Sequence, residues 1–132
     1  MEFYNRPVID YVKTGERLAN LRLNNLKLRK YVCYFNKKKF EQKIKNDRSN
    51  QYYFDRDRPK YNCFANYECE KCTKEMDTLI SAQELANVFG VSRDIINNWE
   101  TGKTTPDIED FLLYSKITGL DLNEIIVFEV EI

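Results

Sequence analysis

Four cysteines are the residues of this sequence best suited to metal chemistry. Cys63, Cys69 and Cys72 lie within ten residues of one another, and Cys33 lies thirty residues upstream. Cysteine thiolates bind zinc tetrahedrally, and the Cys-x-x-Cys spacing of the last two lets one turn supply two ligands. The four cysteines are therefore a candidate structural zinc site. Ordinary reduced cysteines, some of them buried, are the alternative.

Histidine is absent from the sequence. This removes the commonest general base and the commonest metal ligand, and it excludes enzymes that depend on histidine chemistry. The sequence also has no glycine-rich phosphate loop and no Ser or Cys nucleophile paired with a base. We therefore expect no catalytic residues and no enzymatic activity.

Charge is distributed unevenly although the formal net charge is zero. The net charges are +1 over residues 1–22, +6 over residues 23–78 and −7 over residues 79–132. Residues 27–48 hold nine basic and two acidic side chains, interleaved with the aromatic residues Tyr31, Tyr34, Phe35 and Phe40. Such a surface suits contact with phosphates and stacking on bases. A small core of Tyr and Phe with solvated lysines around it is the alternative.

Polar side chains also gather near residue 95, on the second of two short predicted helices. Ser81 and Glu84 form a capping box for a helix over residues 81–89, and Gly90 ends it. Ser92 caps the next helix. Its expected inner side holds Ile95, Ile96 and Trp99, and its outer side holds Arg93, Asp94, Asn97 and Asn98. The two helices and the glycine turn predict a helix-turn-helix.

The sequence from residue 105 to residue 132 predicts two more helices and a strand. Thr105 caps a helix from about Pro106 to Thr118, which buries Ile108, Phe111, Leu112 and Ile117. Asp121 and Glu124 form a capping box for a short helix. The tail over residues 127–132 alternates apolar and acidic residues, which favours a strand. The N-terminal segment FYNRPVI could pair with it, within one chain or across two.

The sequence from Glu84 to Ile126 resembles helices two to five of the lambda-repressor/Cro-like family, also called the xenobiotic-response-element family. The resemblance covers Ala86, the Gly-Val-Ser turn, the Trp-Glu-x-Gly-Lys sequence and the Pro-Asp-Ile-Glu start of a helix. Residues 15–22 are similar to the family's first helix, with Leu18 and Leu21 as core positions. The resemblance also implies an ion pair between Arg22 and Glu100.

This resemblance predicts a mainly α protein built on a five-helix domain. Helix one spans residues 14–26, a basic cysteine-bearing insert spans 27–78, helices two to five span 79–126 and a strand spans 127–132. Family members usually join helices one and two by a few residues. The connection of more than fifty residues here is the main departure from the family pattern.

The resemblance implies a sequence-specific DNA-binding transcriptional regulator, a repressor of bacterial, phage or mobile-element origin. Its recognition helix would lie in the major groove, with Arg93 reading guanine, Asn97 reading adenine and Asp94 accepting from cytosine or orienting Arg93. The expected DNA contacts on bases and phosphates are Ser81, Gln83, Ser92, Arg93, Asp94, Asn97, Asn98, Thr101, Lys103 and Thr104.

A protein-binding scaffold, such as an anti-defence inhibitor, is the alternative, because the acidic end attracts DNA weakly. The sequence also leaves open a homodimer. The N-terminus has neither a basic start nor an apolar stretch, and no apolar run is long enough to cross a membrane, so we expect a cytoplasmic protein.

Overall fold

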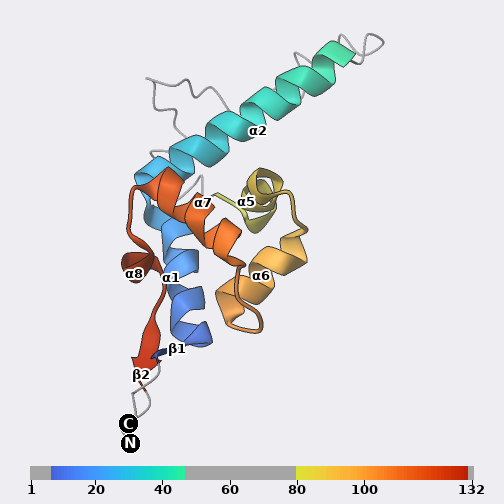
Figure 1. Ribbon diagram of the computed structural model, residues 1–132. Helices are drawn as coiled ribbons and strands as arrows, with labels where there is room; N and C mark the ends of the chain where they lie inside the picture. Colours follow the sequence, from blue (N-terminus) through green and yellow to red (C-terminus); the bar gives the residue numbers. More distant parts are fainter. Residues whose placement is uncertain (1–6, 47–79, 131–132) are drawn as a thin grey trace, which may run out of the picture.

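The computed structural model describes residues 7–46 and 80–130, and within these ranges the protein is mainly helical (Figure 1). The predicted mainly α architecture with short terminal strands is confirmed. The elements in chain order are β1 (Pro7–Ile9), α1 (Tyr11–Asn24), α2 (Leu26–Asn46), α5 (Ala82–Phe89), α6 (Arg93–Thr101), α7 (Ile108–Thr118), α8 (Leu122–Ile125) and β2 (Phe128–Val130).

One hydrophobic core joins elements from both ends of the chain. Helix α1 supplies Leu18 and Leu21, and helices α5 to α8 supply most of the rest, including Leu85, Ile96 and Phe111. An aromatic cluster adds directional packing, with the ring centroids of Phe89 and Trp99 5.5 Å apart and those of Phe89 and Tyr114 4.6 Å apart. The core therefore closes only when α1 packs against helices that follow it by more than fifty residues.

Gly15 sets how closely α1 approaches α6. A Cβ atom at this position would lie 2.5 Å from the carbonyl oxygen of Trp99 and 2.6 Å from that of Glu100. Both atoms belong to the backbone, so no side chain could move aside to make room. A larger residue would push α1 away from the end of α6, which explains the glycine inside this helix.

Strands β1 and β2 pair antiparallel and tie the two ends of the described chain together (Figure 1). Pro7 lies opposite Val130, and Ile9 lies opposite Phe128. The Thr14 hydroxyl extends this contact, because it accepts from the Val127 backbone N–H at 2.9 Å. The pairing is within one chain.

Helix α2 is a separate helix and does not continue α1. Asn25 leaves the helical conformation at φ −77°, ψ 114°, and its side-chain oxygen accepts from the Leu28 N–H at 2.9 Å. Asn25 therefore ends α1 and caps α2. Helix one was predicted over residues 14–26 but spans 11–24, because Asp10 caps its start by accepting from the Lys13 N–H.

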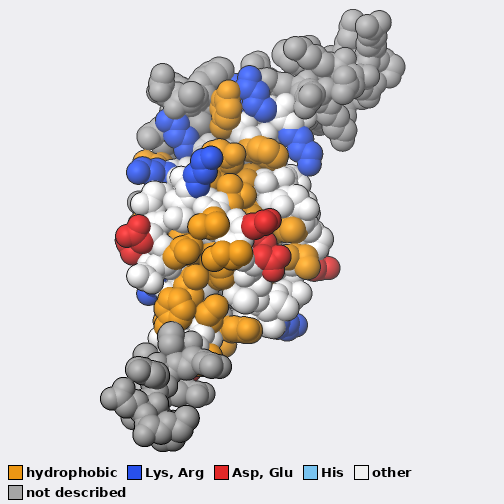
Figure 2. Space-filling view, in the orientation of Figure 1, with side chains coloured by type: hydrophobic (Ala, Val, Ile, Leu, Met, Phe, Trp, Pro, Cys, Tyr) orange, Lys and Arg blue, Asp and Glu red, His pale blue; other side chains and the backbone are white. Residues whose placement is uncertain are grey.

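Three residues predicted to be buried are exposed instead. Ile95 is 38% exposed, Ile108 is 61% exposed and Leu112 is 51% exposed. Ile95 and Ile96 are adjacent on α6, about 100° apart around the helix, and only Ile96 reaches the core. Helix α7 begins after Pro106, with Asp107 rather than Thr105 at its N-cap. Figure 2 shows hydrophobic side chains across the face that α7 occupies.

Candidate nucleic-acid interface

Helices α5 and α6 form the predicted helix-turn-helix pair. Ser81 and Glu84 make a reciprocal capping box at the start of α5, with bonds of 3.0 and 3.1 Å. Gly90 ends α5 in the left-handed conformation at φ 69°, and the following N–H of Val91 donates to the Ala86 carbonyl. Ser92 then caps α6 by accepting from the Ile95 N–H. Local capping residues thus fix the angle at which α6 is presented.

The outer face of α6 is polar and open to solvent. Arg93, Asp94 and Asn97 are exposed, whereas Asn98 is partly buried. Ile96 and Trp99 hold the opposite face in the core. Within the described residues, no ion pair joins Arg93 to Asp94. The arrangement offers a cation, a carboxylate and an amide on one helix face.

Ile95 adds an apolar group that sequence reasoning had assigned to the core. It is 38% exposed on the same helix as Arg93 and Asn97. An apolar side chain on a reading face can contact the methyl group of thymine. Adjacent helical residues can both be buried, as Leu85 and Ala86 are in α5, so the sequence alone carries no signal that Ile95 is the exposed member of the Ile95-Ile96 pair.

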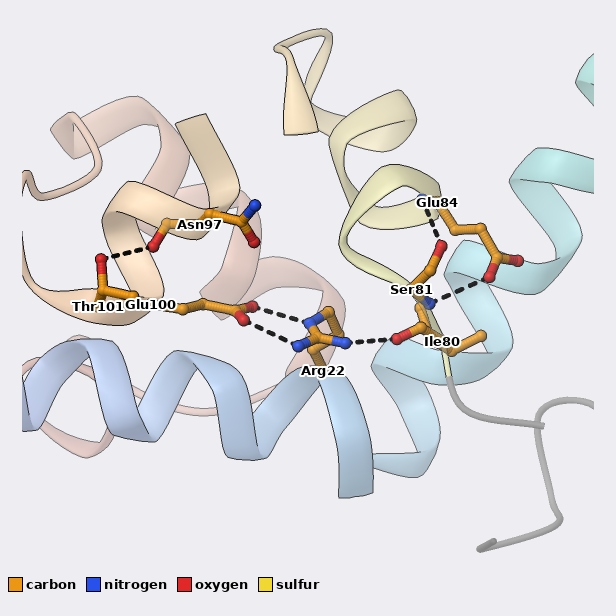
Figure 3. A network of polar contacts seen from close by, with 7 residues as sticks. All are labelled: Arg22, Ile80, Ser81, Glu84, Asn97, Glu100 and Thr101. Carbon is orange, nitrogen blue, oxygen red and sulfur yellow. Dashed lines mark hydrogen bonds and ion pairs between the residues drawn. The ribbon is translucent and has the colours of Figure 1, made fainter. Parts of the chain in front are cut away.

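The residues predicted to contact phosphate differ in whether their polar groups already make hydrogen bonds within the protein. Ser81 is exposed, but both its N–H and its hydroxyl oxygen are engaged by Glu84. The Gln83 side-chain amide donates to the Asn87 side-chain oxygen at 3.0 Å. The Thr101 hydroxyl donates to the Asn97 carbonyl at 2.8 Å (Figure 3). These three residues are already part of the internal hydrogen-bond network.

Lys103, Thr104 and Ser92 flank the outer face of α6 and are exposed. The backbone N–H groups of Lys103 and Thr104 donate to the Asn98 carbonyl, which holds the turn after α6 in place. Their side chains extend into solvent from this fixed turn. A lysine and two hydroxyls at the two ends of a recognition helix suit contact with phosphates.

Arg22 and Glu100 join α1 to α6 through a largely buried ion pair (Figure 3). Arg22 Nε donates to Glu100 Oε2 and Nη2 donates to Oε1, each at 2.9 Å, which is a bidentate geometry. Arg22 Nη1 also donates to the Ile80 carbonyl at 2.6 Å. One guanidinium thus connects α1, the end of α6 and Ile80, which directly precedes the N-cap of α5.

The predicted cysteine cluster lies mostly outside the described residues. Cys63, Cys69 and Cys72 fall in the segment 47–79. Cys33 lies in α2 and is fully buried. No group of three potential metal ligands occurs within residues 7–46 and 80–130.

Comparison with known proteins gives one match. Residues 79–125 match the family model described as helix-turn-helix, which spans α5 to α8. The match covers about a third of the chain and supports a DNA-binding helix-turn-helix domain in this segment. No curated protein and no solved structure matches the chain. Among the described helices, none is long and apolar enough to span a membrane.

Proposed function

We propose that this protein is a sequence-specific DNA-binding repressor of bacterial, phage or mobile-element origin. The observation that carries the proposal is the exposed polar face of α6, held rigidly by the core on its other side. Ile96 and Trp99 anchor the helix, and Glu100 fixes its end to Arg22 of α1. A rigid helix with exposed polar residues is the element that helix-turn-helix proteins place in the major groove.

Base reading is assigned to four exposed residues of α6. Arg93 has the planar fork that pairs with guanine O6 and N7, and Asn97 can pair with the adenine edge. Ile95 contributes an apolar contact to thymine methyl groups. Asp94 accepts from cytosine. Ser92, Lys103 and Thr104 would bind the phosphates on either side and fix the helix in register.

Selection of bound sequences from a random DNA pool tests the proposal first, followed by binding assays on the selected duplex and on a mixed-sequence duplex. Arg93→Ala is expected to weaken binding to the selected duplex about 5- to 150-fold, the equivalent of about 1–3 kcal/mol for a lost bidentate base contact. Binding to the mixed-sequence duplex should fall much less. Lys116→Ala is the control, because it removes one positive charge from an exposed position on α7.

Equal loss of affinity for both duplexes in Arg93→Ala would contradict base reading by Arg93. Failure of the wild-type protein to retain any duplex at low salt, together with capture of a protein partner, would support a scaffold instead. Repression itself is tested by placing the selected sequence over a reporter promoter. Reporter transcription should fall when the wild-type protein is produced and recover with Arg93→Ala.

A further inference from the structure

Helix α2 lies beside the helix-turn-helix pair and packs directly on it. Contacts join α2 to α5 and α5 to α6, so α5 is the middle of three neighbouring helices (Figure 1). Leu28 and Val32 of α2 are fully buried in the common core. The second half of α2 continues past the body of the domain (Figure 1). This helix is a fixed part of the domain that also reaches beyond it.

A row of side-chain amides sets the position of α2 on α5. Asn36 of α2 is buried, and its Nδ2 donates to the Glu84 carbonyl at 3.1 Å and to the Val32 carbonyl at 2.8 Å. Asn87 Nδ2 donates to Asn36 Oδ1 at 2.8 Å, and Gln83 Nε2 donates to Asn87 Oδ1 at 3.0 Å. The row runs from the exposed side of α5 to the point where α2 leaves the domain.

Three consecutive lysines follow Asn36 and point in different directions. At 100° per residue, Lys37 and Lys39 lie about 100° and 60° to either side of the Asn36 row, next to the face that meets α5. Lys38 lies on the far side, with its Nζ 5.5 Å from the centre of the Tyr34 ring. Lys38 and Lys39 are exposed, and Lys37 is partly buried. Of these three lysines, Lys37 and Lys39 are therefore the two nearest the face of α2 that meets α5.

Charge favours a nucleic-acid partner for this helix. Residues 26–46 contain eight basic residues and one acidic residue, whereas residues 79–132 contain three basic and ten acidic residues. Figure 2 shows Lys and Arg side chains gathered at the end of the body where α2 begins. Affinity for DNA rests largely on neutralised phosphates, which the acidic helix-turn-helix half supplies poorly.

The contacts among the three helices limit how far α2 can lie from α6. Packed helices lie about 8–10 Å apart, so with α5 between them the axis of α2 lies up to roughly 16–20 Å from that of α6. The major groove is about 12 Å wide, so a helix this far from one in the groove lies beyond the groove edge. Ten residues after Asn36 extend about 15 Å further. We propose that Lys37 and Lys39 of α2 bind phosphates of double-stranded DNA flanking the site read by α6.

This inference rests on the proposed DNA binding, and salt dependence tests it separately. The test variant is Lys37→Gln with Lys39→Gln. The control variant is Lys27→Gln with Lys38→Gln, which removes the same charge from the same helix. Lys38 lies on the far side of α2. Lys27 lies at the start of α2, with its Nζ near Gly119 at the end of α7. All proteins are titrated with the selected duplex and with a mixed-sequence duplex at several salt concentrations.

The test variant should lower the slope of log K against log salt by about 1 to 2, because each phosphate contact contributes about 0.9. Affinity for the two duplexes should fall by the same factor, since phosphate contacts carry no base information. An unchanged slope in the test variant, or an equal fall in the control variant, would overturn the role of α2. The proposed function would survive that result, because Arg93→Ala would still separate the two duplexes.

Discussion

The ion pair between Arg22 and Glu100 gives the sharpest prediction for stability. Arg22→Met leaves the Glu100 carboxylate, which is 8% exposed, without its partner, and it removes the donor of the Ile80 carbonyl. Removal of one member of a buried pair costs about 3–5 kcal/mol, and the 16% exposure of Arg22 favours the lower end. Glu100→Gln keeps an acceptor oxygen but loses the charge, for a cost of about 1–2 kcal/mol.

The double variant should cost less than the two single variants together. Once Arg22 is gone, removing the charge of Glu100 no longer breaks a bond and instead relieves an unpaired buried carboxylate. We expect a coupling free energy of about 1–2 kcal/mol, within the range found for residues in contact. This coupling is a substantial part of the total stability, because the free energy of unfolding of a small domain is only about 5–15 kcal/mol.

Urea unfolding of the wild type, both single variants and the double variant measures this coupling. A matched control combines Glu100→Gln with Arg17→Met, since Arg17 lies on α1 but donates to the Glu124 carbonyl and shares no partner with Glu100. The control pair should be additive within about 0.5 kcal/mol. If the changes in unfolding free energy for the Arg22 and Glu100 variants also add within about 0.5 kcal/mol, this pair does not couple α1 to α6.

Three further substitutions test single features of the fold. Gly15→Ala should lower the free energy of unfolding by about 3 kcal/mol, because the added Cβ overlaps the Trp99 carbonyl; the shift in urea midpoint measures it. The hydrogen bond from the backbone N–H of Lys13 holds the pKa of Asp10 below its usual 3.8. The ionised Asp10 carboxylate therefore stabilises the fold above about pH 4, and this stabilisation is lost as the pH falls through the lower pKa of the folded state. Asp10→Asn keeps the cap and should weaken the fall in stability on acidification, as followed by circular dichroism. Tyr114 is fully buried, burial raises its pKa, and its hydroxyl has no hydrogen-bond partner among the described residues. Tyr114→Phe should therefore leave stability unchanged or raise it by up to about 1–3 kcal/mol in thermal unfolding.

The features that sequence reasoning located correctly depend on short-range signals. The Ser81–Glu84 box and the Gly90 turn each act within four residues, so the residue types alone determine them. The Arg22–Glu100 pair spans 78 residues, and only the resemblance to a known family indicated it. Local chemistry therefore predicted the helix-turn-helix, and family likeness predicted how α1 joins it.

The features that sequence reasoning missed depend on which neighbour covers a helix. Ile108 and Leu112 have the spacing of an inward helix face, yet they are exposed, and α7 turns Tyr114 and Thr118 to the core beside Phe111, whose burial was predicted. Periodicity fixes which residues share a face but not which face is covered. The role of Asn36 was equally hidden, because its amide contacts depend on α5, whose residues lie nearly fifty positions later in the chain.

The packing of α2 explains how the domain tolerates so long an interruption after its first helix. Loop-closure entropy grows only slowly, by about 0.6 kcal/mol for each doubling of loop length, so lengthening a connection from a few residues to more than fifty costs about 2 kcal/mol. Burial of an aliphatic side chain stabilises by about 1.5–3 kcal/mol. Leu28 and Val32 of α2 are both fully buried in the domain core, so their burial opposes that cost. The interrupting segment therefore begins as part of the domain it interrupts, and α2 has a fixed orientation toward α5 and α6.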